Sequence, residues 1–252
     1  MHGCLPEPED RHQVALVTGA ARRLGRAISL ALARAGIGVV VHYHTSGDEA
    51  DALVTEIRAL GVPAWPLGGD LREEGFEVKL MGTATDLAGP VSYLVNNAAV
   101  YPRDTLAETT AGRIEECVRV NATAPLLLSR AFAAQGRPGA IVNLLDARMG
   151  DRDPAHVAYH LSKRMLAGVT RACALEFAPV VRVNGVAPGL VLAPAGADPG
   201  YLARLAGSDP LGRAGTPEEV AGAVLFLLRN EFVTGQVVYV DGGRHLRGAD
   251  SA

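Results

Sequence analysis

One short segment of the sequence combines the side chains of an acid–base site. Tyr159 and Lys163 are four residues apart in the segment YHLSK, and this spacing places two helical side chains on one face, one turn apart. Tyrosine has a pKa of about 10, but an ammonium group about 4 Å from a phenolate stabilises it by roughly 4 kcal/mol near a protein surface. We therefore predict that Tyr159 exchanges a proton with a substrate and that Lys163 lowers its pKa.

The lysine is informative because the chain contains only 2 lysines against 22 arginines. Tyrosine and lysine four residues apart also occur by chance on many helices, where they have no catalytic role. In a chain that otherwise uses arginine for its cations, a lysine at this spacing favours the functional interpretation.

A second candidate site follows the apolar run Val14–Thr18, where the chain continues as GAARRLG from Gly19 to Gly25. Glycine and small residues allow the backbone to approach a phosphate, and the first turn of a following helix offers free N–H groups. This pattern predicts a phosphate-binding turn, although many helices without a ligand begin in the same way.

The next β-branched run ends in HYHTS, with His44, Thr45 and Ser46 and with no carboxylate before Asp48. A site for NAD usually places an acid here to hold the ribose 2′-hydroxyl, whereas a 2′-phosphate requires donors and no carboxylate. The segment therefore favours NADPH. His42 and His44 could also be a metal pair, but no third ligand accompanies them, so we predict no metal site.

These segments belong to a repeating pattern along the chain. Short β-branched runs alternate with longer stretches of helical periodicity, which is typical of a parallel sheet covered on both faces. We predict one α/β domain over residues 13–252, a doubly wound, mostly seven-stranded parallel sheet, preceded by a flexible tail over residues 1–12. A stretch rich in Pro, Gly and Ala over residues 188–217 is too long for an ordinary connection and is predicted to be a substrate loop.

Composition excludes several other classes of protein. The net charge is −3 and no block of like charges is present, so a nucleic-acid-binding surface is not indicated. Three widely spaced cysteines predict neither a disulfide framework nor a cysteine zinc site. The first residues are acidic and rich in proline, and the apolar region 14–41 is interrupted by arginines, so we expect no signal peptide, no membrane span and a cytoplasmic protein.

Several ordered motifs resemble those of the short-chain dehydrogenase/reductase family. Thr18, Gly19 and Gly25 match its TGxxxGxG fingerprint. The family motifs DL, NNAG and PG correspond to Asp70-Leu71, to residues 96–99 and to Pro188-Gly189. The resemblance implies a Rossmann fold, and it implies that these residues bind the dinucleotide: Gly19, Arg22, Arg23, Leu24, Gly25, His44, Thr45, Ser46, Asp70, Leu71, Asn97, Ala98, Ala99, Tyr159, Lys163, Pro188 and Gly189.

In that family the catalytic residues form a tetrad, which Asn121, Tyr159 and Lys163 match. The fourth position, thirteen residues before the tyrosine, normally holds serine, whereas this chain has Asp146. A carboxylate beside the tyrosine opposes formation of the phenolate, so this departure does not suit ordinary ketone reduction.

Pteridine reductases, one branch of the family, also have aspartate at the position of Asp146. The chain resembles them further in Arg23, in its HYHxS segment, in Tyr101 and in the ending DGGRHLR. The resemblance implies NADPH-dependent reduction of a dihydropterin C=N bond, with Arg23, Tyr101, Asp146 and Tyr159 at the substrate. Ala99 departs from that branch, where a serine commonly touches the cofactor or the pterin.

Two other functions remain open. The chain could be a carbonyl or 3-oxoacyl reductase that tolerates Asp146, or a catalytically silent dinucleotide-binding regulator. Family members are commonly tetramers built on their last two long helices, and the resemblance implies a homotetramer here. The helical stretches 155–177 and 218–228 have apolar faces that suit such an interface, but the same faces would also suit a core.

Overall fold

The protein is described here by a computed structural model that covers residues 13–150, 154–194, 196–207 and 209–247. The predicted tail over residues 1–12 lies outside this range. The prediction of one doubly wound parallel sheet is confirmed, because seven parallel strands lie in the order β3-β2-β1-β4-β5-β6-β7. The strands are β1 (Val14–Val17), β2 (Gly38–Tyr43), β3 (Ala64–Gly68), β4 (Tyr93–Asn96), β5 (Gly139–Leu144), β6 (Val181–Pro188) and β7 (Val237–Val240).

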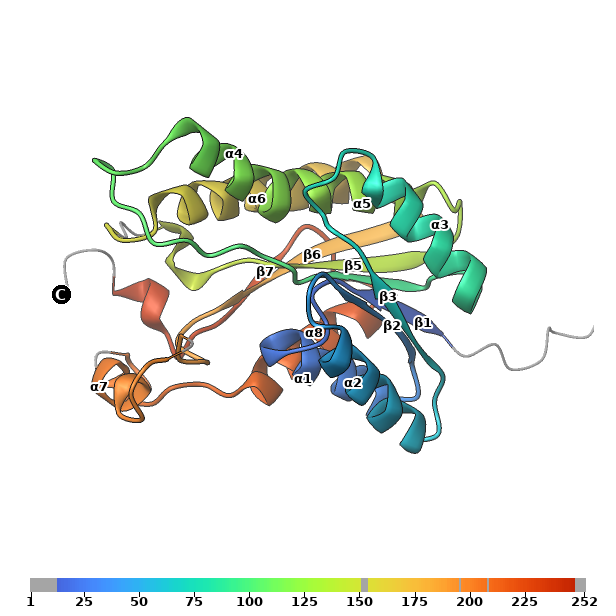
Figure 1. Ribbon diagram of the computed structural model, residues 1–252, viewed down its shortest axis with the longest axis horizontal. Coiled ribbons are helices and arrows are strands. Elements are labelled where there is room, and N and C mark those ends of the chain that lie inside the picture. The colour runs from blue at the N-terminus through green and yellow to red at the C-terminus, as the bar shows by residue number, and fades with distance from the viewer. Residues whose placement is uncertain (1–12, 151–153, 195, 208, 248–252) are drawn as a thin grey trace, which may run out of the picture.

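Helices cover both faces of this sheet (Figure 1). One layer contains α1 (Arg23–Arg34), α2 (Gly47–Ala59) and α8 (Pro217–Arg229), and the other contains α3 (Phe76–Ala88), α4 (Ala111–Val118), α5 (Ala124–Ala133) and α6 (Val157–Glu176). Alternation along β1 explains the two cores, since Ala15 and Val17 pack toward the first layer and Leu16 toward the second. Both faces of the central strands are therefore buried.

The strand order reverses between β1 and β4, since β2 and β3 lie on the far side of β1 and β5, β6 and β7 lie on the far side of β4. In open α/β sheets, ligands bind beyond the carboxyl ends of the strands at such a reversal. Most of the motifs predicted to carry the chemistry follow strands or begin the helices after them, so the fold gathers them at one edge. Asn121 is the exception, because it lies between α4 and α5.

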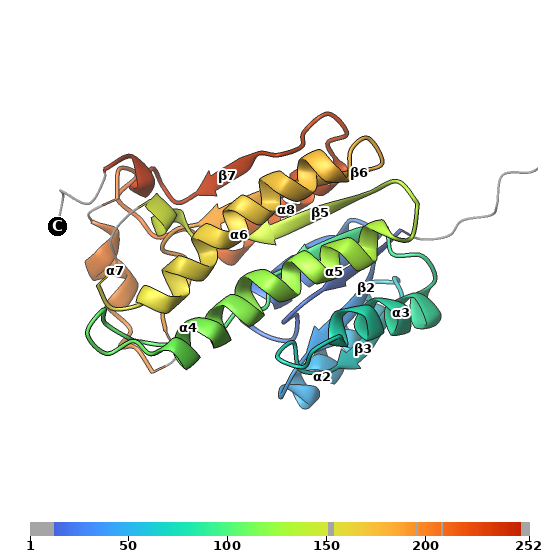
Figure 2. The same cartoon turned by 90° about the horizontal axis from the view of Figure 1, so that it is seen from above.

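The apolar periodicity of residues 112–134 is typical of one long helix, but the helix is interrupted in the structure. α4 gives way to a π turn over Arg119–Thr123, and α5 begins after it. Seen from above, α4 and α5 follow one line beside α6 (Figure 2). Cys117, Asn121, Ala124 and Leu128 are buried at intervals of three or four residues through the π turn, so the spacing of the buried positions does not reveal it.

The predicted substrate loop contains one short helix, α7 (Tyr201–Ala206), and ends at α8. α8 starts with a capping box in which Thr216 and Glu219 bond each other's backbone N–H groups. The C-terminal segment holds the loop, because Arg244 pairs with the buried Asp209 at 3.0 Å. The loop is thus anchored at its far end as well as where it leaves β6.

Candidate active site

The turn after β1 forms a backbone cradle. Gly19 has a φ of 61°, a left-handed conformation that favours glycine, and a Cβ atom on Gly25 would lie 2.2 Å from the carbonyl oxygen of Gly19. α1 begins behind the cradle with no side-chain cap and no acidic residue in its first turn. The N–H groups of a first helical turn lack partners within the helix and bind anions, so this cradle suits a phosphate.

The segment after β4 supports the cradle through backbone contacts. The side-chain amide of Asn97 donates to the carbonyl oxygens of Thr18 and Gly19 at 2.9 and 3.0 Å. In return, the N–H groups of Asn97 and Ala98 both donate to Thr18 Oγ1 at 3.0 Å. The ends of β1 and β4 therefore hold each other in place.

His42, at the end of β2, also holds the cradle. The N–H of Gly19 donates to His42 Nδ1 at 3.3 Å, and the N–H of Ala20 donates to the His42 carbonyl oxygen at 2.8 Å. Because Nδ1 accepts a hydrogen bond, the ring is neutral with its proton on Nε2. Burial lowers the pKa of His42 to about 4, which keeps the ring in this form. From the sequence, His42 was considered as part of a possible metal pair and of the HYHxS segment, and its contact with Gly19 was not predicted.

Arg23 takes the place of the middle glycine of the family fingerprint, and its backbone keeps the conformation of a glycine. Its φ is 54°, whereas every other positive φ among the described residues belongs to glycine. The guanidinium crosses to the substrate loop, where Nη2 donates to the carbonyl oxygen of Ala193 at 2.8 Å. Arg23 therefore connects the phosphate turn with the loop predicted to cover the substrate.

A cleft of about 390 Å³ opens over the cradle. Its walls bring together most of the residues predicted to bind the cofactor: Gly19, Arg22, Arg23, Leu24, Gly25, His44, Thr45, Ser46, Asp70, Leu71, Asn97, Ala98 and Ala99. Arg72 and Val120 also line the cleft. Neither was among the predicted cofactor-binding residues, although each directly adjoins a predicted site residue, Leu71 or Asn121.

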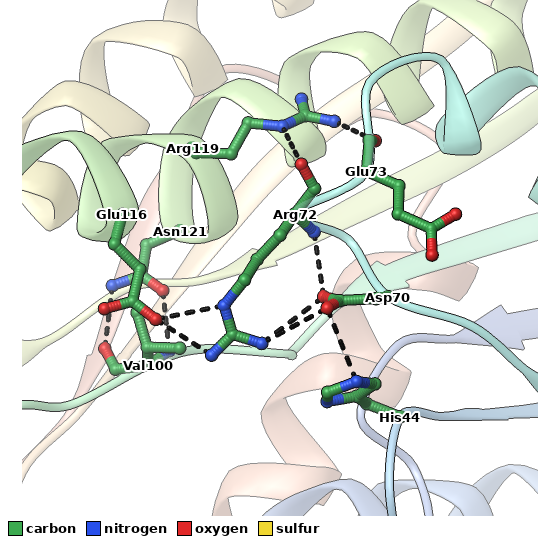
Figure 3. Close-up of polar contacts among 8 residues, drawn as sticks. All are labelled: His44, Asp70, Arg72, Glu73, Val100, Glu116, Arg119 and Asn121. Atoms are coloured by element: carbon green, nitrogen blue, oxygen red, sulfur yellow. Dashed lines mark hydrogen bonds and ion pairs between the residues drawn. The ribbon is translucent and has the colours of Figure 1, made fainter. Parts of the chain in front are cut away.

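The side chains of His44 and Arg72 reach Asp70 in this cleft (Figure 3). His44 Nε2 lies 3.4 Å from Asp70 Oδ2, and Arg72 Nη1 lies 3.4 Å from both carboxylate oxygens. Burial would raise the pKa of the Asp70 carboxyl, but the hydrogen bond from the Arg72 N–H and the nearby charges outweigh it and lower the pKa. Asp70 therefore presents a fixed carboxylate, which can accept a hydrogen bond from an amine.

Tyr159 and Asp146 meet further along the same edge of the sheet. Tyr159 lies in the first turn of α6, is 8% exposed, and donates from its hydroxyl to Asp146 Oδ2 at 3.1 Å. Asp146 follows β5, and its Oδ1 accepts a hydrogen bond from the N–H of Arg148 at 2.7 Å. The structure thus brings together the two residues that the sequence placed thirteen positions apart.

The predicted lowering of the Tyr159 pKa is wrong in this structure. Burial, followed by the charge of Asp146, raises the pKa of Tyr159 well above its ordinary value. Lys163 Nζ lies 5.6 Å from the centre of the tyrosine ring and donates to the carbonyl oxygen of Leu144 at 2.7 Å. Burial lowers the pKa of Lys163 itself to about 8. Burial, which the sequence does not show, and the Asp146 carboxylate both oppose the effect expected of the Lys163 charge, so Tyr159 is a protonated donor.

Asn121 lies in the π turn with every polar atom of its side chain engaged. Its amide nitrogen donates to the Val100 carbonyl oxygen at 3.0 Å and to Ser162 Oγ at 2.9 Å, and its oxygen accepts from the Val100 N–H at 2.8 Å. Ser162 in turn donates to the Tyr159 carbonyl oxygen at 2.6 Å. Within the described ranges, Asn121 is thus joined to the backbone of Tyr159, and no hydrogen bond joins it to Lys163.

Tyr101, which was predicted to contact the substrate, lies beside Tyr159. Its ring is 52% exposed and contacts the edge of Tyr159 with ring centres 4.5 Å apart. His156 stacks on Tyr101 at 4.0 Å and makes a 2.8 Å contact from Nδ1 to the Pro102 carbonyl oxygen. The sequence analysis missed His156, and its only signal was its place three residues before Tyr159.

The predicted residues Pro188 and Gly189 follow at the end of β6. A Cβ atom on Gly189 would lie 2.6 Å from the Cα of Asp241, so the glycine permits close packing against the segment after β7. Neither residue lines the cleft over the cradle, and the same is true of Tyr159 and Lys163. The site therefore has two parts, a cleft at the ends of β1 to β4 and an acid–base group at the end of β5.

The first part fits a dinucleotide cofactor. The cradle would be filled by a side chain at Gly19 or Gly25, the first turn of α1 is free of acids, and a carboxylate lies at the end of β3. These are a phosphate site and an amine acceptor along one cleft. No group of three or more metal-ligating side chains is found among the described residues.

Comparisons with known proteins agree with this geometry. Residues 19–245 match the family model described as enoyl-(acyl carrier protein) reductase. The chain is 34% identical to a 3-oxoacyl-[acyl-carrier-protein] reductase of Synechocystis, over 92% of this chain and 96% of that protein. It is 33% identical to a D-erythrulose reductase of Gallus gallus, over 94% and 98%.

A solved structure is also similar. It is FolM alternative dihydrofolate reductase 1 of Brucella suis in complex with NADP, with a TM-score of 0.88 and 34% identity over 93% of this chain and 95% of that one. The family match, these relatives and the site geometry lead to one conclusion: the chain belongs to the short-chain dehydrogenase/reductase family of oxidoreductases.

Proposed function

We propose that this protein is an NADPH-dependent reductase that transfers hydride to a C=N bond of a dihydropterin-like substrate. The cleft supports the choice of cofactor, because His44, Thr45 and Ser46 line it at the end of β2 and no carboxylate belongs to that segment. Donors without a carboxylate suit a ribose 2′-phosphate. The similar FolM structure is a complex with NADP.

In this proposal the cradle of Gly19 and Gly25 binds the pyrophosphate, Asp70 accepts a hydrogen bond from the adenine amine, and Lys163 binds the nicotinamide ribose. When bound, NADPH supplies a hydride, which is one proton with an electron pair. The substrate carbon gains that hydride, the C=N double bond becomes single, and its nitrogen requires one proton.

The observation that carries the choice of substrate is the hydrogen bond from Tyr159 to Asp146. A carboxylate only accepts hydrogen bonds, so Asp146 suits a substrate with N–H groups and repels the oxygen of a ketone. Tyr159, whose pKa is raised by burial and by Asp146, holds the proton that the reduced nitrogen needs. Tyr101 offers a half-exposed ring on which a flat heteroaromatic substrate can stack, and Arg23 is close enough to the substrate loop to bind the same substrate.

A carbonyl reductase is the second candidate, and one observation favours it. A protonated Tyr159 is also the donor that a ketone oxygen needs, and two relatives are described as a 3-oxoacyl-[acyl-carrier-protein] reductase and a D-erythrulose reductase. Under this alternative Asp146 is only tolerated.

Replacing the carboxylate distinguishes the two candidates. Asp146→Ser restores the residue usual in the family, and we expect it to lower kcat/KM for a dihydropterin about 100-fold, the lower end of what one general acid–base group contributes. Turnover of an acetoacetyl thioester should stay equal or rise. Unchanged pterin turnover in Asp146→Ser would show that the role given to this carboxylate is wrong.

We also propose a cytoplasmic homotetramer. No helix in the described part of the chain is long and apolar enough to cross a membrane. α6 exposes Leu161, Met165 and Leu175, and α8 exposes Phe226, which supports contacts between copies through these two helices. Light scattering on the purified protein tests this, and a monomeric mass would exclude the tetramer.

A further inference from the structure

Arg119 is the residue at which the helix before the catalytic asparagine leaves α-helical geometry. It begins the π turn that carries Asn121. A π turn inserts one extra residue into the helical hydrogen-bond ladder, and such turns are frequent at functional sites. The orientation of the Asn121 amide toward Val100 and Ser162 therefore depends on what holds this turn.

The guanidinium of Arg119 is held by three groups of the segment after β3. Nε donates to the Arg72 carbonyl oxygen at 3.3 Å, and Nη2 donates to the Glu73 carbonyl oxygen at 2.5 Å (Figure 3). Nη1 forms an ion pair with Glu77 Oε1 at 2.5 Å. Every nitrogen of this guanidinium thus has a partner on one neighbouring segment.

Glu77 is an unusual partner because its carboxylate lies in the protein interior. The Glu77 side chain is 1% exposed, against 21% for Arg119. Arg119 is the only cation within ion-pair distance of it in the part of the chain that the structure describes. Removing a carboxylate from water costs several kcal/mol, and apolar residues in place of a buried pair are often as stable or more so. Stability alone therefore does not explain why the pair is here.

We propose that Arg119, held by Glu77, is a positioning residue that fixes the π turn so that the Asn121 amide meets Val100 and Ser162. A second arginine makes a similar connection in the opposite direction. Arg72 extends from the same segment to Glu116 on α4, with Nε and Nη2 at 3.0 and 2.8 Å from Oε1. Two arginines thus connect the segment that carries Asp70 with the helix that leads to Asn121.

Amide exchange in the protein without cofactor or substrate tests this positioning directly. The N–H of Val100 donates to Asn121 Oδ1, so a displaced π turn exposes that hydrogen. We expect Arg119→Met to speed exchange of the Val100 amide about tenfold, the loss of one internal hydrogen bond. Arg113→Met is the matched control, since Arg113 is exposed on α4 and its guanidinium forms no hydrogen bond or ion pair among the described residues. In this variant the exchange rate of the Val100 amide should not change.

A second variant separates positioning from stability. Arg119→Met leaves the Glu77 carboxylate buried without its partner and is expected to destabilise the fold. In Arg119→Met/Glu77→Met both charges are absent, and stability should return. The proposal predicts that fast Val100 exchange persists in this stable double variant. Exchange that returns to the rate of the unmodified protein would overturn the proposal.

Kinetics give an independent readout, which rests on the proposed function for its substrate. We expect the stable double variant to lower kcat about 10- to 100-fold, the scale of a misplacement of about 1 Å. KM for NADPH should change less, because Arg72 keeps its own contacts with Asp70 and Glu116. In an Asn121→Ala background the same double change should have no further effect on kcat. Additive effects would overturn the positioning role, whereas no pterin turnover by the unmodified protein would contradict only the proposed function.

Discussion

The two halves of the site, the cofactor cleft and the acid–base group around Tyr159, depend on different kinds of contact. The cofactor half depends on the backbone cradle of Gly19 and Gly25, which the side-chain amide of Asn97 supports by donating to two carbonyl oxygens. The substrate half is made of side chains, in which Tyr159 bonds Asp146 and Tyr101 stacks on His156. The first half matches the family fingerprint at Gly19 and Gly25 and departs from it at Arg23, whereas the second departs from the family tetrad at Asp146.

The reason for this difference is physical. A cradle whose Cβ positions would clash at 2.2 Å admits only glycine, so the sequence there has few alternatives. A proton donor requires a group of suitable acidity at a suitable distance, and several side chains can meet that requirement. The cofactor half therefore identifies the family, and Asp146 in the substrate half distinguishes this member from those with the usual tetrad.

The largest expected effect separates the two halves. Tyr159→Phe removes the donor hydroxyl but keeps the buried ring, so we expect kcat to fall about 10²- to 10⁴-fold, the contribution of a general acid. The affinity for NADPH, measured by fluorescence titration, should change little. A loss of NADPH binding comparable to the loss of kcat would show that the halves are not separate.

The cofactor half is tested by one methyl group. In Gly25→Ala, the added Cβ would lie 2.2 Å from the carbonyl oxygen of Gly19, so the cradle must open. We expect NADPH affinity to fall at least about 100-fold, which corresponds to roughly 3 kcal/mol.

The matched control is Gly168→Ala on α6, where an added Cβ meets nothing within 4 Å. This variant should bind NADPH normally and gain about 1 kcal/mol in unfolding free energy, because alanine favours a helix over glycine. Normal NADPH binding by Gly25→Ala would contradict the phosphate cradle.

Sequence reasoning found the cofactor half more completely than the substrate half. Glycine turns and strand-end motifs are local in sequence, so their contacts follow from short patterns. Even so, β3 carries Trp65 and Pro66 and did not stand out as a β-branched run; proline is tolerated there because β3 is an edge strand.

Contacts between distant residues gave no such signal. Glu77 and Arg119 are far apart in sequence and neither belongs to a motif, so their pairing could be seen only in the structure. The π turn was hidden because the apolar periodicity continues through it. The pKa of Tyr159 was predicted in the wrong direction because burial, which the sequence does not state, and the Asp146 carboxylate both raise it.

The pH dependence of the unfolding free energy tests the role of His42 in the cofactor half. Its pKa is about 4 in the folded protein and about 6.5 when unfolded. Between these values the unfolded chain binds more protons, so this group lowers the unfolding free energy as the pH falls from 6.5 to 4, by roughly 3 kcal/mol in total.

The comparison variant is His42→Gln, whose side-chain oxygen can still accept from Gly19 but does not titrate in this range. Denaturant unfolding at several pH values should show a shallower decline for this variant. Equal slopes would mean that the neutral ring of His42 does not support the cradle.

The smallest expected effect concerns Arg23, where the two halves meet. Arg23→Gly relieves a φ of 54°, a conformation that costs a non-glycine residue about 1 kcal/mol, but it removes the hydrogen bond to Ala193. We expect a slightly more stable protein whose KM for the substrate rises about tenfold. An unchanged substrate KM would mean that Arg23 contributes to the cofactor half alone.

The central claim is the substrate class, and one steady-state assay tests it most directly. NADPH oxidation by the unmodified protein is followed with dihydrobiopterin or dihydromonapterin, and separately with an acetoacetyl thioester. The account predicts turnover of the pterin, with a kcat/KM well above that for the thioester. Turnover of the thioester alone would contradict the pterin assignment, while the fold and the family membership would stand.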